Sequence, residues 1–125
     1  KDYVLLGGFL KGLDTVEELR LDLQENMVGD AGCEALFKKL SLPAATCLSL
    51  QLEKCEISDT GCTALSDFLR SLKTVVELDL QLARNLISDG GCNKLTMVLE
   101  GSPQLQALSL DLCQNMVGNP GCEAL

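Results

Sequence analysis

The seven cysteines are the residues of this chain most capable of chemistry, because thiolates bind soft metals and form disulfides. Four of them recur at intervals of 29, 30 and 30 residues, each directly after a glycine: Gly32-Cys33, Gly61-Cys62, Gly91-Cys92 and Gly121-Cys122. If these pairs lie on stacked helices, neighbouring copies are about 8–10 Å apart, beyond the ~6.8 Å between Cα atoms that a disulfide spans. We therefore interpret the ladder as structural, with glycine allowing close approach of the next unit and cysteine acting as a small apolar filler.

The other three cysteines stand singly, and no C-x-x-C pair occurs: Cys47, Cys55 and Cys113. This pattern is typical of a reduced protein, so we expect seven free thiols and a cytoplasmic location. No apolar run approaches the ~18 residues of a membrane span, so no membrane partner is expected.

A column of aspartates also recurs once per unit and could be imagined as a cation site: Asp30, Asp59 and Asp89, with Asn119 in the fourth copy. Both residue types are good helix N-caps, and Pro120 follows Asn119 where the first helical residue should lie. We therefore predict that each caps its own helix, and we expect no metal and no cofactor.

Catalytic chemistry finds little support in this composition. The absence of histidine excludes histidine-based acid–base catalysis. No nucleophile–base pair, phosphate loop or pair of catalytic carboxylates can be assembled, so we predict neither an enzyme nor a small-molecule substrate. The net charge of −8 argues against a nucleic-acid partner, which requires clustered Lys and Arg.

The elements that position these residues follow from leucine spacing. Thirteen residues before each recurring glycine an L-x-L-x-L run begins, at Leu19, Leu48, Leu78 and Leu108. Its period of two predicts a strand with one buried face. Self-similarity at this interval marks a solenoid. We expect units at about 16–44, 45–74, 75–104 and 105–125, with 1–13 forming the helix of a preceding unit, so that the chain is part of a larger protein.

Two further columns follow each strand. The first is expected to be buried and to bond the backbone of the turn: Asn26, Cys55, Asn85 and Asn115. The second returns the chain to the core: Val28, Ile57, Ile87 and Val117. Leucines four residues apart then predict an amphipathic helix in each unit: Leu36/Leu40, Leu65/Leu69 and Leu95/Leu99.

Alternating strands and helices with short connections predict a parallel sheet with all helices on one side. Strands are about 4.7–4.9 Å apart, whereas helices need about 8–10 Å, so the stack must curve. The predicted fold is an α/β solenoid, a horseshoe with parallel strands on the concave face and helices on the convex face.

The repeated pattern L-x-x-L-x-L…N-x-[V/I]-G-D-x-G-x-x-x-L resembles the leucine-rich repeats of the ribonuclease-inhibitor-like class, across essentially the whole chain. That class includes ribonuclease inhibitor, the sensor arms of nucleotide-binding immune receptors and GTPase-activating proteins for Ran. One departure is consistent, because each unit inserts an extra x-L after the strand motif: Asp22-Leu23, Gln51-Leu52, Gln81-Leu82 and Asp111-Leu112. The insertion is expected to extend or bulge the strand.

The strand positions that face away from the core should form a concave wall with six carboxylates and one arginine. Such a field attracts a basic protein. The alternative is that these charged residues have no binding role and only keep the protein soluble. The predicted partner-binding residues are Glu18, Arg20, Asp22, Gln51, Glu53, Glu77, Asp79, Gln81 and Asp111.

We predict a scaffold for protein–protein interaction that recognises a basic protein partner through its concave face. A first alternative is a fixed structural component of a large multiprotein assembly. A second, implied by the resemblance, is a GTPase-activating or other enzyme-regulatory role. For that role the nearest candidates are Arg84 and Asn85, although Asn85 already has a predicted structural duty.

Overall fold

The computed structural model describes residues 14–116. Its elements alternate between strand and helix in the order β1 (Glu18–Asp22), α2 (Gly29–Lys39), β2 (Cys47–Gln51), α3 (Asp59–Arg70), β3 (Glu77–Gln81), α4 (Asp89–Glu100) and β4 (Ala107–Asp111). The predicted helix at 1–13 and the predicted start of the last helix, with Asn119, Pro120 and Gly121-Cys122, lie outside the described residues.

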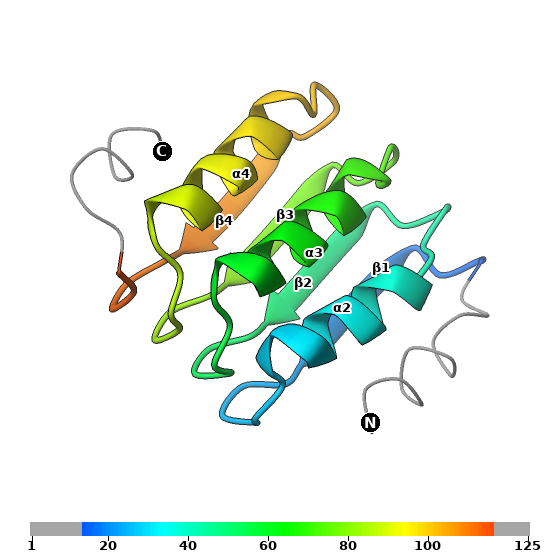
Figure 1. Ribbon diagram of the computed structural model, residues 1–125. Coiled ribbons are helices and arrows are strands. Elements are labelled where there is room, and N and C mark those ends of the chain that lie inside the picture. The colour runs from blue at the N-terminus through cyan, green and yellow to red at the C-terminus, as the bar shows by residue number, and fades with distance from the viewer. Residues whose placement is uncertain (1–13, 117–125) are drawn as a thin grey trace.

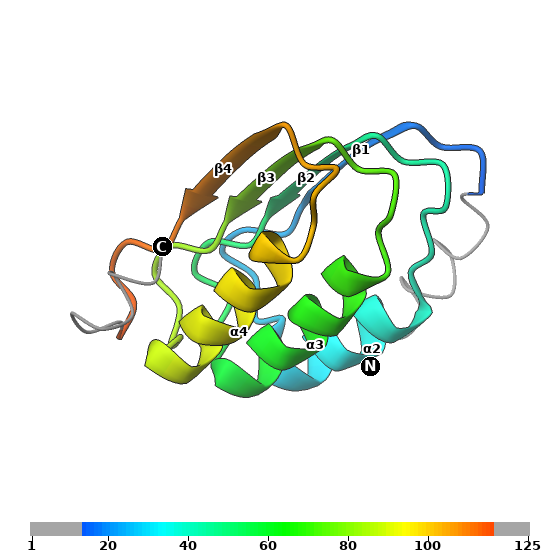
Figure 2. The ribbon, with the colours of Figure 1, turned by 90° about the horizontal axis from the view of Figure 1, so that it is seen from above.

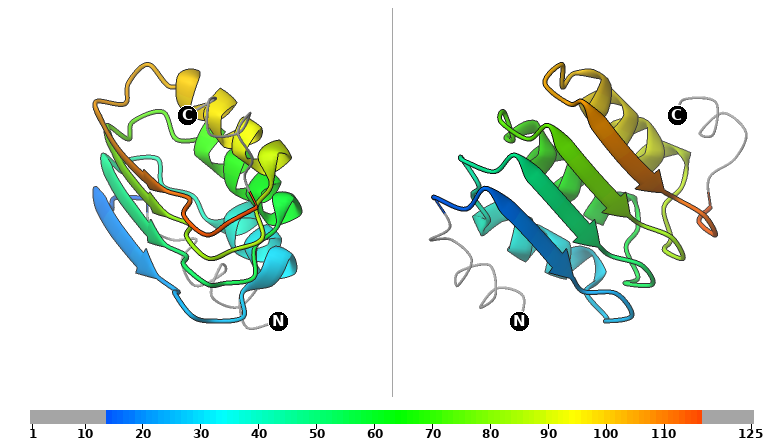
Figure 3. Two further views of the ribbon diagram at one scale, coloured as in Figure 1. Left: turned by 90° about the vertical axis from the view of Figure 1, so that its left-hand side faces the viewer. Right: turned by 180° about the vertical axis from the view of Figure 1, so that it is seen from behind.

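The four strands form one parallel sheet in the order β1-β2-β3-β4. Equivalent leucines lie side by side across it, so that Leu19 pairs with Leu48 and Leu48 with Leu78. The three helices cover one face of the sheet and leave the other face open (Figures 1 and 2). The end view in the left panel of Figure 3 shows the two layers. The predicted solenoid, with strands on the concave side and helices on the convex side, is confirmed.

The extra x-L of each unit extends the strand and does not bulge it. Backbone pairing continues past the end of β2, where Leu52 N donates to Gln81 O at 2.8 Å and Lys54 N donates to Ala83 O at 3.0 Å. Equivalent bonds join the other units in the same register. The added leucine is fully buried in the second and third units, so it contributes one more layer to the core.

The core is a stack of aliphatic layers. Strand, turn and helix each contribute one or two side chains per unit, all essentially inaccessible to solvent: Leu36, Leu50, Leu52, Ile57, Leu65, Leu80, Leu82, Ile87 and Leu95. The aromatic pair Phe37–Phe68 stacks between α2 and α3 with ring centroids 5.1 Å apart.

The asparagine column bonds turn backbone, as predicted, and in the later units it also joins neighbouring units. Its predicted burial holds for Cys55 and Asn85, whereas Asn26 is exposed. Asn85 Oδ1 accepts from the amides of Cys55 at 2.9 Å and Ile57 at 3.0 Å, both in the preceding unit. Its Nδ2 donates to Leu52 O at 2.9 Å and Leu82 O at 3.0 Å. One buried amide group therefore satisfies the turns of two units at once.

Cys55 occupies the asparagine position of the second unit and takes over its role as a hydrogen-bond donor, but not its role as an acceptor. Its thiol donates to Leu23 O at 3.0 Å, as Asn115 Nδ2 donates to Leu82 O at 2.8 Å in the fourth unit. Asn115 also accepts from Ile87 N at 3.0 Å, whereas a sulfur atom is only a weak acceptor. The substitution predicted for Cys55 is therefore confirmed for the donor role.

The prediction that the aspartates cap their own helices is wrong. The N-cap residues are Val28, Ser58 and Ser88. Asp30 lies inside the first turn of α2 and reaches the next unit, where its carboxylate accepts from Ser58 N at 2.8 Å and Gly61 N at 2.9 Å. Asp59 binds Ser88 in the same way. The reason is stacking, since each carboxylate lies beside the start of the following helix, whose first amides are otherwise unpaired.

The recurring glycines make room for this contact. A Cβ built on Gly61 would stand 2.6 Å from Asp30 Oδ1, and one on Gly91 would stand 2.5 Å from Asp59 Oδ1. Close approach between units was predicted for these glycines and is confirmed. They are the third residues of α3 and α4.

Candidate protein-binding surface

The open face of the sheet carries the predicted partner-binding residues. We call this face the inner wall, and the right panel of Figure 3 views the sheet from that side. The register places its side chains in three rows across the strands: Glu18, Cys47, Glu77 and Ala107; Arg20, Ser49, Asp79 and Ser109; Asp22, Gln51, Gln81 and Asp111. Eight of the nine predicted residues therefore share one surface, and Glu53 follows two residues after β2.

The position two residues after each strand does not continue these rows. It is occupied by Gln24, Glu53, Ala83 and Cys113, and Ala83 is buried. The row is therefore interrupted in the third unit, and Glu53 and Cys113 do not belong to one continuous exposed strip.

Asp79 is the centre of a polar network on the inner wall. Its Oδ2 accepts from Ser49 Oγ at 3.1 Å and Gln51 Nε2 at 3.0 Å, and its Oδ1 accepts from Gln81 Nε2 at 2.5 Å. Gln81 also reaches Ser109 Oγ at 3.4 Å. Three strands thus hold one carboxylate in a fixed position, which reduces the entropy lost when a partner binds it.

These bonds decide the charge state of the carboxylate. Partial burial acts to raise the pKa of Asp79, but the hydrogen bonds from Gln81, Ser49, Gln51 and Ser109 outweigh it and leave the pKa below its usual value. The pKa of Asp111 is also lowered, mainly because Cys113 N donates to its Oδ1 at 2.9 Å. Both groups are therefore anionic at neutral pH.

A shallow hollow of about 580 Å³ lies over the N-terminal halves of the strands. Its lining includes the carboxylates of Glu18, Glu77 and Asp79 and the guanidinium of Arg20. Cys47 adds a thiol that contacts Glu77 Oε2 at 3.4 Å. Carboxylates around an open hollow suit the cationic end of a side chain better than they suit an anion.

The thiols offer no reactive centre within the described part of the chain. All six cysteines there are free, and Cys33, Cys55, Cys62 and Cys92 are buried. Burial, with a smaller contribution from nearby acidic groups, raises the pKa of Cys33 and of Cys62 to about 12. Cys122 lies outside residues 14–116.

Within residues 14–116, no group of three or more His, Cys, Asp or Glu side chains is placed to hold a metal ion. Nor does any helix of that segment combine the length and the apolar character needed to cross a membrane.

Sequence reasoning missed one exposed apolar row. The residue just before Val28, Ile57 and Ile87, together with its equivalent in the fourth unit, forms what we call the rim column: Met27, Glu56, Leu86 and Met116. Met27 is 79% exposed, Leu86 53% and Met116 65%. The column could have been recognised in the sequence, because a large apolar residue recurs there in three of four units. It was missed because it lies between the predicted strand and the predicted helix, where no period predicts which side chains are exposed.

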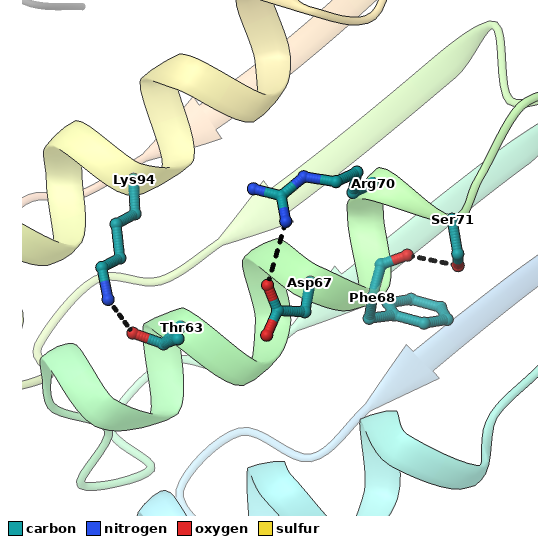
Figure 4. A network of polar contacts seen from close by, with 6 residues as sticks. All are labelled: Thr63, Asp67, Phe68, Arg70, Ser71 and Lys94. Atoms are coloured by element: carbon teal, nitrogen blue, oxygen red, sulfur yellow. Dashed lines mark hydrogen bonds and ion pairs between the residues drawn. The ribbon is translucent and has the colours of Figure 1, made fainter.

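The helical side has a different character. A groove of about 740 Å³ lies between α2 and α3, with Phe37 and Phe68 in its lining. Polar contacts cross the neighbouring surface, where Lys94 Nζ donates to Thr63 Oγ1 at 2.7 Å and Arg70 pairs with Asp67 at 3.3 Å (Figure 4). The charges on this side are mixed, in contrast to the inner wall.

The two residues considered for GTPase activation lie in different environments. Asn85 is 5% exposed and its amide is occupied by the turns. Arg84 is exposed and has a left-handed backbone conformation with φ of 58°. Only Arg84 could therefore approach a bound partner.

Comparison with known proteins agrees with this architecture. The family model described as "Leucine Rich repeat" matches residues 19–37 and 46–66. Mouse ribonuclease inhibitor (Mus musculus) is 39% identical over 66 residues, which are 53% of this chain and 14% of that protein. Pig ribonuclease inhibitor (Sus scrofa) is 37% identical over 60 residues, which are 48% of this chain and 13% of that protein. Each match thus spans a small part of the relative.

Solved structures extend the likeness over nearly the whole chain. The tropomodulin C-terminal domain from Caenorhabditis elegans superposes with a TM-score of 0.68 at 16% identity, covering 99% of this chain and 73% of that one. The actin-binding site 2 of leiomodin-1 superposes with a TM-score of 0.60 at 16% identity, covering 98% of this chain and 68% of that one. At this identity the likeness concerns the fold. Together with the repeated motif and the parallel sheet, these matches show that the chain has the fold of a leucine-rich repeat solenoid and that its sequence is similar to ribonuclease inhibitor.

Proposed function

We propose that this chain is a protein-interaction scaffold whose inner wall binds the basic surface of a protein partner, as part of a larger protein. The observation that carries the proposal is the charge of the three wall rows, where Arg20 is the one cation beside five carboxylates. Like charges on one surface repel each other and mildly oppose folding. A binding role gives a reason for their accumulation.

Three further observations support a protein partner. Leucine-rich repeats generally mediate protein interactions, and the leiomodin-1 structure is described as an actin-binding site. Asp79 is held by three strands before any partner arrives. The buried free thiols fit the proposed cytoplasmic location, because thiols persist in reducing compartments.

The test uses charge reversal on the exposed part of the wall. The variant Glu18→Lys/Glu77→Lys removes two carboxylates from the hollow without touching the Asp79 network. The matched control Glu34→Lys/Glu100→Lys makes the same change in charge on the exposed helical side. Proteins captured from cell extract with the unaltered chain would be identified, and their association rates measured against ionic strength.

We expect the wall variant to slow association more than the control and to weaken its salt dependence, because exposed charges act mainly on the encounter rate. The proposal fails if capture depends on the helical side and not on the wall. That result would favour the alternative of a fixed component of a multiprotein assembly. A GTPase-activating role would depend on Arg84, and its replacement by alanine offers a direct test of that alternative.

A further inference from the structure

The contacts between successive units do not have the same hydrogen bonds along the chain. We call each of them a joint and number the joints in chain order, so that the first lies between the units at 16–44 and 45–74. At the second joint, Asn85 Oδ1 accepts from Cys55 N at 2.9 Å and from Ile57 N at 3.0 Å. At the third joint, Asn115 Oδ1 accepts from Ile87 N at 3.0 Å. At both joints an asparagine carbonyl therefore holds the turn of the preceding unit.

The first joint lacks this acceptor, because Cys55 occupies the asparagine position. Its thiol donates to Leu23 O at 3.0 Å, but sulfur is only a weak acceptor. The two amides that an asparagine would hold are those of Asn26 and Val28. Asn26 N donates to Leu23 O of its own turn at 3.3 Å, and Val28 N forms no hydrogen bond with residues 45–74. The first turn is therefore held less firmly to its neighbour than the turns that follow.

The backbone of the first turn also follows a different path. At the second joint Leu86 N donates to Ile57 O at 2.7 Å, and an equivalent bond is present at the third joint. At the first joint this bond is replaced by one from Gly29 N to Cys55 O at 2.9 Å. Gly29 has a φ of 66°, in the left-handed region that favours glycine. A left-handed glycine is thus found in the turn that the asparagine contact does not hold.

Side chains on the inner wall join β2 to β3 but not β1 to β2. Asp79 of β3 accepts from Ser49 Oγ and Gln51 Nε2, which both belong to β2. Three wall residues of β1 form no side-chain hydrogen bond or ion pair with β2, although both strands are described in full: Glu18, Arg20 and Asp22. β1 also lies at the edge of the sheet (Figure 3). The strand and the turn of the first unit therefore both lack contacts that the second unit has.

The helical layer of the first joint has its full set of contacts. Asp30 of α2 accepts from Ser58 N at 2.8 Å and from Gly61 N at 2.9 Å. Phe37 of α2 stacks on Phe68 of α3. A carboxylate with two backbone donors and a stacked aromatic pair keep α2 docked on α3. The weak part of the first joint is therefore confined to β1 and the turn after it.

We propose that β1 and the turn after it, residues 18–28, open locally from the sheet while α2 stays docked on α3. Proteins open locally where a segment has fewer stabilising contacts than its surroundings. Because one column of the inner wall lies on β1, this opening makes that edge of the wall movable beside the fixed carboxylate of Asp79. The inference goes beyond the proposed function and does not depend on it.

Hydrogen exchange of backbone amides, followed by NMR on the 125-residue chain, measures the opening. Equivalent amides donate across each joint to carbonyls of the next unit: Leu23 and Glu25 at the first, Leu52 and Lys54 at the second, and Leu82 and Arg84 at the third. After correction for intrinsic rates, we expect the first pair to exchange about tenfold or more faster than the other two, while amides inside α2 stay protected. Equal rates at the first and third joints would reduce the effect to ordinary fraying of the end strands and would overturn the inference.

The variant Cys55→Asn supplies the missing acceptor and should make the fold more stable. We expect it to slow exchange of the amides at the first joint by about tenfold and to leave those of the second joint unchanged. Cys55→Ala is the matched control, because it removes the thiol without adding an acceptor, and it should not slow exchange. Unchanged exchange at the first joint in Cys55→Asn, or equal slowing in Cys55→Ala, would contradict the inference. Neither result bears on whether the inner wall binds a basic partner, so the two proposals can fail separately.

Discussion

At the scale of single residues, the buried and half-buried polar side chains form hydrogen bonds with the backbone of a neighbouring unit. Asn85 satisfies two amides of the unit before it, and Asp59 binds the helix start of the unit after it. The column positions of both residues were predictable from the sequence, because they recur at the unit interval. That Asn85 bonds the backbone of its own turn, at Leu82 O, follows from local chemistry. That Asp59 bonds Ser88 of the next unit could not be predicted, because it depends on how two helices stack.

Replacement of Asn85 by alanine should lower the free energy of unfolding by about 1–3 kcal/mol, because it leaves buried amides and carbonyls without partners. Chemical denaturation of the chain measures this. Gln106→Ala is the control on an exposed side chain, and its effect should stay within about ±0.5 kcal/mol. Equal losses in the two variants would contradict the structural role of the asparagine column.

Exposure of the thiols gives a second expectation at this scale. Under native conditions Cys47 and Cys113 should react with an alkylating reagent well before the four buried cysteines of the described segment. The pKa of Cys113 is raised chiefly by its contact with Asp111. Asp111→Asn should therefore lower that pKa, increase the thiolate fraction at pH 8 and speed the labelling of Cys113, as followed by mass spectrometry. Labelling of Cys62 at a comparable rate would contradict the buried ladder.

At the scale of elements, the starts of α3 and α4 each depend on an aspartate of the preceding helix. Partial burial acts to raise the pKa of Asp59, but its bonds from Ser88 and Gly91 and the charge of Lys94 leave the pKa lowered. A lowered pKa in the folded state gives stability that is present above the unfolded value near 4 and is lost as pH falls through the folded value. Asp59→Asn should therefore reduce stability at pH 7 and flatten its decline below about pH 4.

The measurement is the denaturation midpoint of the chain as a function of pH, and Asp67→Asn is the control. Asp67 is an exposed carboxylate of the same helix, and its salt bridge to Arg70 on the surface contributes little. A pH profile of the Asp59 variant that parallels the unaltered chain would rule out the inter-unit cap.

The fold itself was predictable at this scale, because leucine periods of two and four report which faces are buried. The strand register and the extension by Leu52 and Leu82 follow from that pattern. The leucine periods do not assign the burial of Ala83 or the exposure of Leu86, although the recurrence of a large apolar residue at the position of Leu86 is visible in the sequence. Both lie after the strand, where the chain turns between layers and no simple period assigns a side chain to a face.

At the scale of the whole molecule, the two long surfaces have different chemistry. The inner wall is acidic and partly preorganised, and its adjoining edge carries the apolar rim column, while the helical side is mixed in charge. Charge reversal on the wall should therefore slow the association of a protein partner more than the same change on the helical side.

The bonds that cross between units have opposite directions, and this gives the chain a rule of assembly. Asp30 and Asp59 reach forward to the next unit, and Asn85 and Asn115 reach back to the previous one. A unit with an aspartate and an asparagine in these two columns therefore carries both halves of the joint, whereas the second unit, with Cys55, supplies only the donor part of the asparagine half. Gain or loss of 29 or 30 residues by duplication preserves every joint, whereas a cut within a unit leaves one neighbour's helix start or the other's turn without its bonds. The same two columns that stabilise the molecule thus define the step by which such a chain can grow or shorten in evolution.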